Sequence, residues 1–222
     1  MRGSVREKAR RLALHAALVA ALCVPAWSVQ AQPFDAHRGL QRLAASPSVR
    51  ALVQRVLGTA DNRARAWAVI DKHEARVFVF AADGRVVGAT PALLGSAPGD
   101  FSAPAVGAKA ATYIPPEERT TPAGRFLSRP GHNLKGEAVV WVDYTAAVAI
   151  HRLRPAPAHE RRPQRLASAS PEDNRITLGC VVVSAAFYDG VVAPLLGQGL
   201  GVVYVLPESR DWASIFEDAA EL

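Results

Sequence analysis

The chain has 222 residues, half of them apolar, and carries a formal net charge of +6 at neutral pH. This apolar fraction excludes overall disorder, and the length suffices for one domain with a sizeable core. Five of the 26 basic residues but only one of the 20 acidic residues lie in the first 31 positions. The remainder therefore carries a net charge of only +2, which gives little support for nucleic-acid binding.

The first 31 residues have the pattern of a secretory signal peptide. A basic start precedes an apolar stretch from Leu12 to Trp27, and Val29-Gln30-Ala31 supplies small residues for cleavage. The apolar stretch is short for a membrane span, so an uncleaved anchor is the less favoured interpretation. Lipoprotein processing at Cys23 is disfavoured because a bulky residue precedes it. We expect residues 1–31 to be removed on export, leaving a periplasmic or otherwise exported protein without a transmembrane span.

Residues 32–65 are predicted to form an N-terminal helical extension. Their apolar residues recur at spacings that suit one or two short amphipathic helices, and Ser46 or Ser48 could cap the second. The extension would pack on the outside of the domain.

From residue 66 the pattern becomes one of short strands. The predicted strands are 66–71, 75–80, 85–90, 124–128, 138–144, 146–153, 181–183 and 202–206. A long loop is expected over 91–118 and a short helix over 185–195. We therefore predict a mainly β domain over residues 66–207, a sandwich or a partly closed barrel, followed by a C-terminal tail at 208–222.

An insertion at 155–174 is rich in proline and arginine. Composition favours a solvated surface loop. The insertion lies between His151 and Cys180, which are the candidate catalytic residues discussed below. This position also allows a loop over the active site that contacts an anionic substrate.

Cys180 would be the single cysteine left after export. An unpaired thiol in an oxidising compartment is a candidate reactive group, although a buried structural cysteine is the competing interpretation. A cysteine nucleophile needs a nearby base, and His151 is the histidine that ends a β-type apolar run. Backbone N–H groups around Leu178, Gly179 and Cys180 could bind an oxyanion. One cysteine and scattered histidines do not make a standard zinc site.

Four segments in a defined order resemble the L,D-transpeptidase catalytic domain of bacterial cell-wall enzymes. They are Thr121-Pro122-Ala123-Gly124-Arg125-Phe126, Ala149-Ile150-His151, Thr177-Leu178-Gly179-Cys180-Val181 and the closing strand 201–207. Each is short, but the ordered set covers about residues 66–207 and is much more specific than any one motif.

The resemblance implies an L,D-transpeptidase-like fold and a cysteine acyltransferase that acts on peptidoglycan stem peptides. Cys180 would attack the bond between the third and fourth stem residues, and His151 would be the base. Thr177 matches the hydroxyl position of the motif, and the N–H groups of Gly179 and Cys180 would bind the oxyanion. The family needs no metal or organic cofactor.

The sequence departs from the family pattern at several positions. Leu178 replaces a usual histidine, and Val182 replaces a usual asparagine or arginine. Arg152 follows the catalytic histidine where a small residue is common, and we name Arg152 and Arg175 as candidate substrate-loop residues. These departures leave two alternatives open: a hydrolase on the same scaffold and a non-catalytic peptidoglycan-binding module. The sequence carries no signal for the acceptor, the preferred stem or the oligomeric state.

Overall fold

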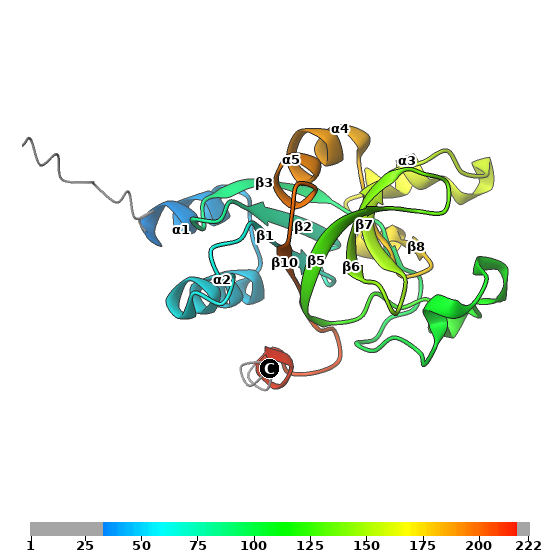
Figure 1. Ribbon diagram of the computed structural model, residues 1–222, viewed down its shortest axis with the longest axis horizontal. Helices are drawn as coiled ribbons and strands as arrows, with labels where there is room; N and C mark the ends of the chain where they lie inside the picture. The colour runs from blue at the N-terminus through cyan, green and yellow to red at the C-terminus, as the bar shows by residue number, and fades with distance from the viewer. Residues whose placement is uncertain (1–32, 217–222) are drawn as a thin grey trace, which may run out of the picture. The chain divides into compact units, whose positions relative to one another are not determined.

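The computed structural model describes residues 33–216 (Figure 1). The predicted export segment lies outside the described residues, as do residues 217–222 of the predicted tail. None of the helices between residues 33 and 216 combines the length and the apolar character that crossing a bilayer requires.

One eight-stranded sheet forms the body of the described chain (Figure 1). In spatial order its strands are β3 (Val86–Pro91), β2 (Arg76–Phe80), β1 (Trp67–Asp71), β10 (Gly201–Val205), β5 (Gly124–His132), β6 (Ala138–Asp143), β7 (Val148–Arg152) and β9 (Val181–Val183). The β1–β10 and β7–β9 pairs are parallel and the other neighbours are antiparallel. Runs of β-branched and aromatic residues account for seven of the eight strands, the exception being β5, and the sequence predicted each of the eight.

The segment after β3 nearly closes this sheet. Leu93 exchanges two backbone hydrogen bonds with Val182 of β9, at 2.8 and 2.9 Å. A two-stranded sheet continues the contact, pairing β4 (Leu94–Gly95) with β8 (Arg175–Thr177). The expectation of a mainly β, partly closed barrel is therefore confirmed, whereas β4 and β8 were not predicted.

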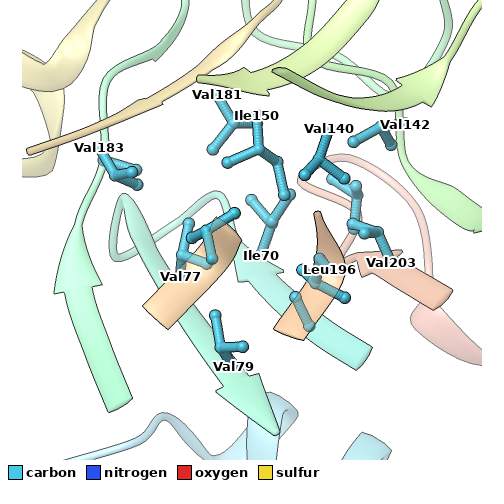
Figure 2. Close-up of a cluster of buried hydrophobic side chains, with 14 of the residues drawn as sticks. Ile70, Val77, Val79, Val140, Val142, Ile150, Val181, Val183, Leu196 and Val203 are labelled. Atoms are coloured by element: carbon cyan, nitrogen blue, oxygen red, sulfur yellow. The ribbon is translucent and has the colours of Figure 1, made fainter. Parts of the chain in front are cut away.

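The inner face of the curved sheet holds the main core. Alternate residues of six strands meet there, and Figure 2 shows core side chains from several of these strands lying close together. A helical segment covers this core with Tyr188, Val192 and Leu196, all at most 1% exposed. It runs as α4 (Ala185–Phe187), the π-helical turn η6 (Tyr188–Val192) and α5 (Ala193–Leu196). This is the short helix expected over 185–195.

The outer face of β1, β2 and β10 is covered by α1 (Pro33–Arg42), α2 (Pro47–Thr59) and α6 (Trp212–Phe216). Trp67 stacks on Phe80 at 3.9 Å between ring centroids, and both side chains are fully buried there. Ser46 caps α2 by accepting a hydrogen bond from the Val49 N–H, as its position predicted. The helices of residues 33–65 thus bury the second face of the same sheet.

The proline- and arginine-rich insertion folds into three short helices: η4 (Ala158–Glu160), α3 (Arg162–Leu166) and η5 (Pro171–Asn174). Leu166 of α3 packs with Leu93 and Val182 in a small apolar cluster. Val182 is consequently 1% exposed. The insertion is anchored on the strand that follows Cys180. Three further single-turn helices, η1 (Val106–Ala108), η2 (Ala111–Tyr113) and η3 (Pro116–Glu118), lie within the predicted long loop.

Candidate active site

Cys180 and His151 lie on the same face of two adjacent parallel strands. The β7–β9 register pairs Ile150 with Val181 and His151 with Val182. Ile150 and Val181 point into the main core, so the intervening side chains point to the opposite face. Cys180, directly before β9, and His151 are therefore one diagonal step apart on that face. The structure brings together the two residues that sequence reasoning named as nucleophile and base.

The Cys180 thiol is half-buried and rests as a neutral group. Its Sγ lies 3.6 Å from the Ala147 carbonyl oxygen, in the turn before β7, and donates a weak hydrogen bond there. Burial raises the pKa of Cys180 above its usual value, while the Ala149 backbone and the charge of Arg154 oppose that rise. Within residues 33–216 the thiol hydrogen bond runs to Ala147 and not to His151.

His151 is held as a neutral imidazole of defined orientation. Its ring is 9% exposed, and Nδ1 lies 2.8 Å from the Arg152 carbonyl oxygen. A carbonyl can only accept, so Nδ1 carries the proton and Nε2 is left as the basic nitrogen. Burial lowers the pKa of His151 to about 4, and the charges of Arg154 and Arg162 act in the same direction. At neutral pH the imidazole is thus unprotonated, with Nε2 as its free acceptor nitrogen.

The turn that carries Cys180 is fixed by Thr177. The Thr177 hydroxyl donates to the Cys180 carbonyl at 2.7 Å and accepts from the Gly179 N–H at 3.1 Å. Thr177 is the residue at the hydroxyl position of the motif that the sequence resembles. This geometry also corrects one expectation, because the Gly179 N–H is occupied by Thr177 and does not face an oxyanion. Leu178, at the tip of the turn, is 37% exposed.

Gly179 is required by the backbone at this turn. Its φ is 131°, which other residues rarely adopt, and a Cβ there would lie 2.8 Å from the Thr120 carbonyl oxygen. The glycine therefore permits the close approach of the 120–121 segment to the nucleophile turn.

Thr121 is a site residue that sequence reasoning left without a role. It is fully buried, and its hydroxyl donates to the Gly179 carbonyl at 2.8 Å. The same oxygen accepts from the Gly95 N–H at 2.9 Å. The sequence marked Thr121 as the start of a family-like segment, but the partner lies 58 positions away.

The structure does not bring the predicted substrate-loop residues Arg152 and Arg175 to the thiol. Arg152 lies on the core-side face of β7, where its Nε bonds Asp189 at 2.7 Å and its guanidinium stacks on Tyr188. Alternation along β7 separates it from His151. Arg175 donates to the Lys72 carbonyl at 3.0 Å and pairs with Glu208. The guanidinium groups of Arg152 and Arg175 therefore make structural contacts within the domain.

An open groove of about 670 Å³ lies on the thiol-bearing side of the sheet. It is lined by β5, β6 and the turn that follows, including Arg129, Trp141 and Tyr144. Arg129 of β5 lies opposite Trp141 of β6, and Trp141 lies opposite Ala149 of β7. Ala149 in turn lies beside Cys180, the residue before β9.

Residues 33–216 contain no cluster of three or more His, Cys, Asp or Glu side chains able to hold a metal ion. Cys180 and His151 are therefore the candidate nucleophile and base of this site.

The chain is similar in structure to L,D-transpeptidase catalytic domains from several species. The L,D-transpeptidase of Xylanimonas cellulosilytica shares 21% identity with a TM-score of 0.38, the alignment covering 64% of this chain and 60% of that one. The catalytic domain of the E. faecium L,D-transpeptidase shares 16% identity with a TM-score of 0.36, over 64% and 96% of the two chains. The helical cell shape determining protein Pgp2 of Campylobacter jejuni shares 13% identity with a TM-score of 0.40, over 66% and 48%.

The matched region thus spans about 60% of the first of these chains. No family model and no curated protein matches the sequence.

Proposed function

We propose that this protein is an exported cysteine acyltransferase that acts on peptidoglycan tetrapeptide stems. The observation that carries the proposal is the placement of Cys180 and His151 on one sheet face, with the imidazole proton fixed on Nδ1. This leaves Nε2 as a base on the same face as the thiol. The ordered motifs from Thr121 to Cys180 supply the substrate class.

The reaction follows from the two neutral groups. His151 Nε2 takes the thiol proton as Cys180 Sγ attacks the carbonyl carbon of the third stem residue. The C–N bond to the terminal D-Ala breaks, and the imidazolium returns the proton to the leaving amine. The product is a thioester between the stem and Cys180. An amine of a second stem then attacks the thioester, loses its proton to His151 and releases the thiol.

The acyl-enzyme can be tested directly. Incubation with a purified tetrapeptide stem should add the mass of the stem minus D-Ala to the protein, as read by intact-protein mass spectrometry. The Cys180→Ala variant should acquire no adduct, because the nucleophile is gone, whereas His73→Gln should react like the unmodified protein. His73 is exposed in the turn after β1, does not line the groove, and serves as a matched control for histidine substitution. An adduct on a folded Cys180→Ala variant would contradict the proposal.

A hydrolase on the same scaffold is the second candidate. The exposed Leu178 and the buried Val182 favour it, because neither supplies a polar side chain to bind an acceptor stem. Water would then resolve the thioester, and the products would be shortened stems without cross-links.

A non-catalytic wall-binding module is the third candidate. It is favoured by the raised pKa of the thiol, since a thiol is a poor nucleophile until it is deprotonated. It predicts binding to wall sacculi without any acyl-enzyme.

A further inference from the structure

The orientation of the Cys180 N–H is set by a hydroxyl on the far side of its peptide bond. The carbonyl of Gly179 and the N–H of Cys180 belong to one planar, trans peptide unit, so they point in opposite directions. Thr121 Oγ1 donates to that carbonyl at 2.8 Å. The Cys180 N–H is therefore directed away from Thr121.

Hydroxyl groups hold each of the three successive peptide units around the nucleophile. The unit before Gly179 is held through its N–H, and the unit after Cys180 through its carbonyl, both by Thr177 Oγ1. In the middle unit, between Gly179 and Cys180, the Thr121 hydroxyl bonds the carbonyl and not the N–H. Its N–H, on the cysteine itself, is thus the group suited to meet an oxyanion formed at the thiol.

The hydroxyl of Thr121 has little freedom to turn away. The Gly95 N–H donates to Thr121 Oγ1 at 2.9 Å, so the hydroxyl proton is left for the Gly179 carbonyl. The Thr121 carbonyl accepts from Lys72 Nζ at 3.0 Å. Lys72 is itself fully buried and bonded to Asp100 at 3.0 Å. Thr121 is therefore anchored through both its backbone and its side chain.

We propose that Thr121 is a positioning residue that aims the Cys180 N–H at the oxyanion formed when the thiol attacks an acyl group. The inference rests on the proposed acyl transfer. It deepens that proposal by naming the Cys180 N–H, in place of the Gly179 N–H, as the oxyanion donor. It also gives Thr121 the role of orienting that donor. Removing one oxyanion donor typically slows such reactions by about 10²–10³-fold, so misdirecting one should cost about tenfold or more.

The test compares two reactions of the same thiol. In acylation by p-nitrophenyl acetate the thiol adds to the ester carbonyl to form an oxyanion, which collapses as p-nitrophenolate leaves. Alkylation by iodoacetamide displaces iodide without forming an oxyanion. In Thr121→Val we expect acylation to fall about tenfold or more while alkylation changes by less than about twofold. Thr121→Ser should restore acylation because it restores the hydroxyl. Thr120→Val, at the adjacent buried threonine, is the matched control and should leave both rates unchanged.

Equal effects on both reactions, or no effect on either, would overturn the role of Thr121 while leaving acyl transfer intact. A parent protein that is alkylated but never acylated would instead overturn the proposed function.

A measurement on the unmodified protein covers the case in which Thr121→Val does not fold. On addition of a peptide aldehyde, which forms a hemithioacetal with Cys180, the Cys180 amide proton should shift in the NMR spectrum much more than that of Gly179. The reverse pattern would overturn the inference.

Discussion

At the scale of single residues, the defining property of the site is that both reacting groups rest uncharged. Burial raises the pKa of Cys180 and lowers that of His151 to about 4. A preformed thiolate–imidazolium pair would show the opposite shifts. In the proposed acyl transfer, proton transfer would therefore belong to the reaction itself, and His151 would act as a base at the moment of attack.

The lowered pKa of His151 makes a prediction about stability. An unfolded histidine titrates near 6.5, so between about pH 6.5 and 4 the unfolded chain binds a proton that the folded chain excludes. Stability conferred by the neutral ring is full above pH 6.5 and should fall by about 3 kcal/mol as the pH drops to 4. His151→Gln should lose this component of the pH dependence in urea unfolding, whereas His132→Gln should keep it. Identical pH profiles for His151→Gln and the unmodified protein would refute the buried neutral state.

At the scale of elements, packing accounts for the apolar side chain of Val182 in the segment that resembles the L,D-transpeptidase motif. Val182 lies under Leu166 of the insertion and contacts Leu93, so an apolar side chain is required there. Leu178 is exposed at the turn tip and has no such constraint. The insertion and Val182 thus form one structural unit.

Introducing at positions 178 and 182 the residues usual in L,D-transpeptidase motifs should change the free energy of unfolding by unequal amounts. Val182→Asn places an amide in the apolar cluster and should reduce the free energy of unfolding by about 1–3 kcal/mol. Leu178→His, at the exposed tip, should change it by less than about 0.5 kcal/mol. Urea unfolding of both variants tests this. A Val182→Asn variant as stable as the parent would contradict the packing of Leu166 on β9.

The sequence predicted the elements better than it predicted the contacts of the site. Seven of the eight main strands carry local runs of β-branched and aromatic residues, whereas β5 does not. The sequence indicates His151 by its place at the end of such a run, and Cys180 as the single cysteine of the predicted exported chain. The two-residue β4 pairs with a segment about 80 positions away and leaves no local pattern. Arg152 was assigned to the site by its nearness to His151, although period-two alternation puts it on the other face. Thr121 was missed because its role depends on a contact with Gly179.

At the scale of the whole described chain, a buried charge network joins segments that are distant in sequence. Lys72 bonds Asp100 and the carbonyl of Thr121, and Asp100 in turn accepts from the backbone N–H groups of Glu208 and Ser209. The end of β1, the support of the nucleophile turn and the segment after β10 are thereby tied together.

Removing the cation from this network should strongly reduce the free energy of unfolding. Lys72→Met leaves the Asp100 carboxylate buried without its cation and should lower the free energy of unfolding by about 3 kcal/mol or more. The Lys72→Met/Asp100→Asn double variant should be less destabilised than the sum of its single variants, because the unpaired charge is removed. Additive losses in this double-mutant cycle would show that the pair is not coupled.

The central claim is that Cys180 and His151 carry out acyl transfer on peptidoglycan stems. Its most direct test is mass spectrometry of disaccharide-tetrapeptides incubated with the purified protein, beside the folded Cys180→Ala variant. The account predicts cross-linked dimers that have lost one D-Ala, formed only when Cys180 is present. Shortened stems without dimers would assign the scaffold to hydrolysis. Unchanged stems, or dimers formed equally by the Cys180→Ala variant, would contradict the account.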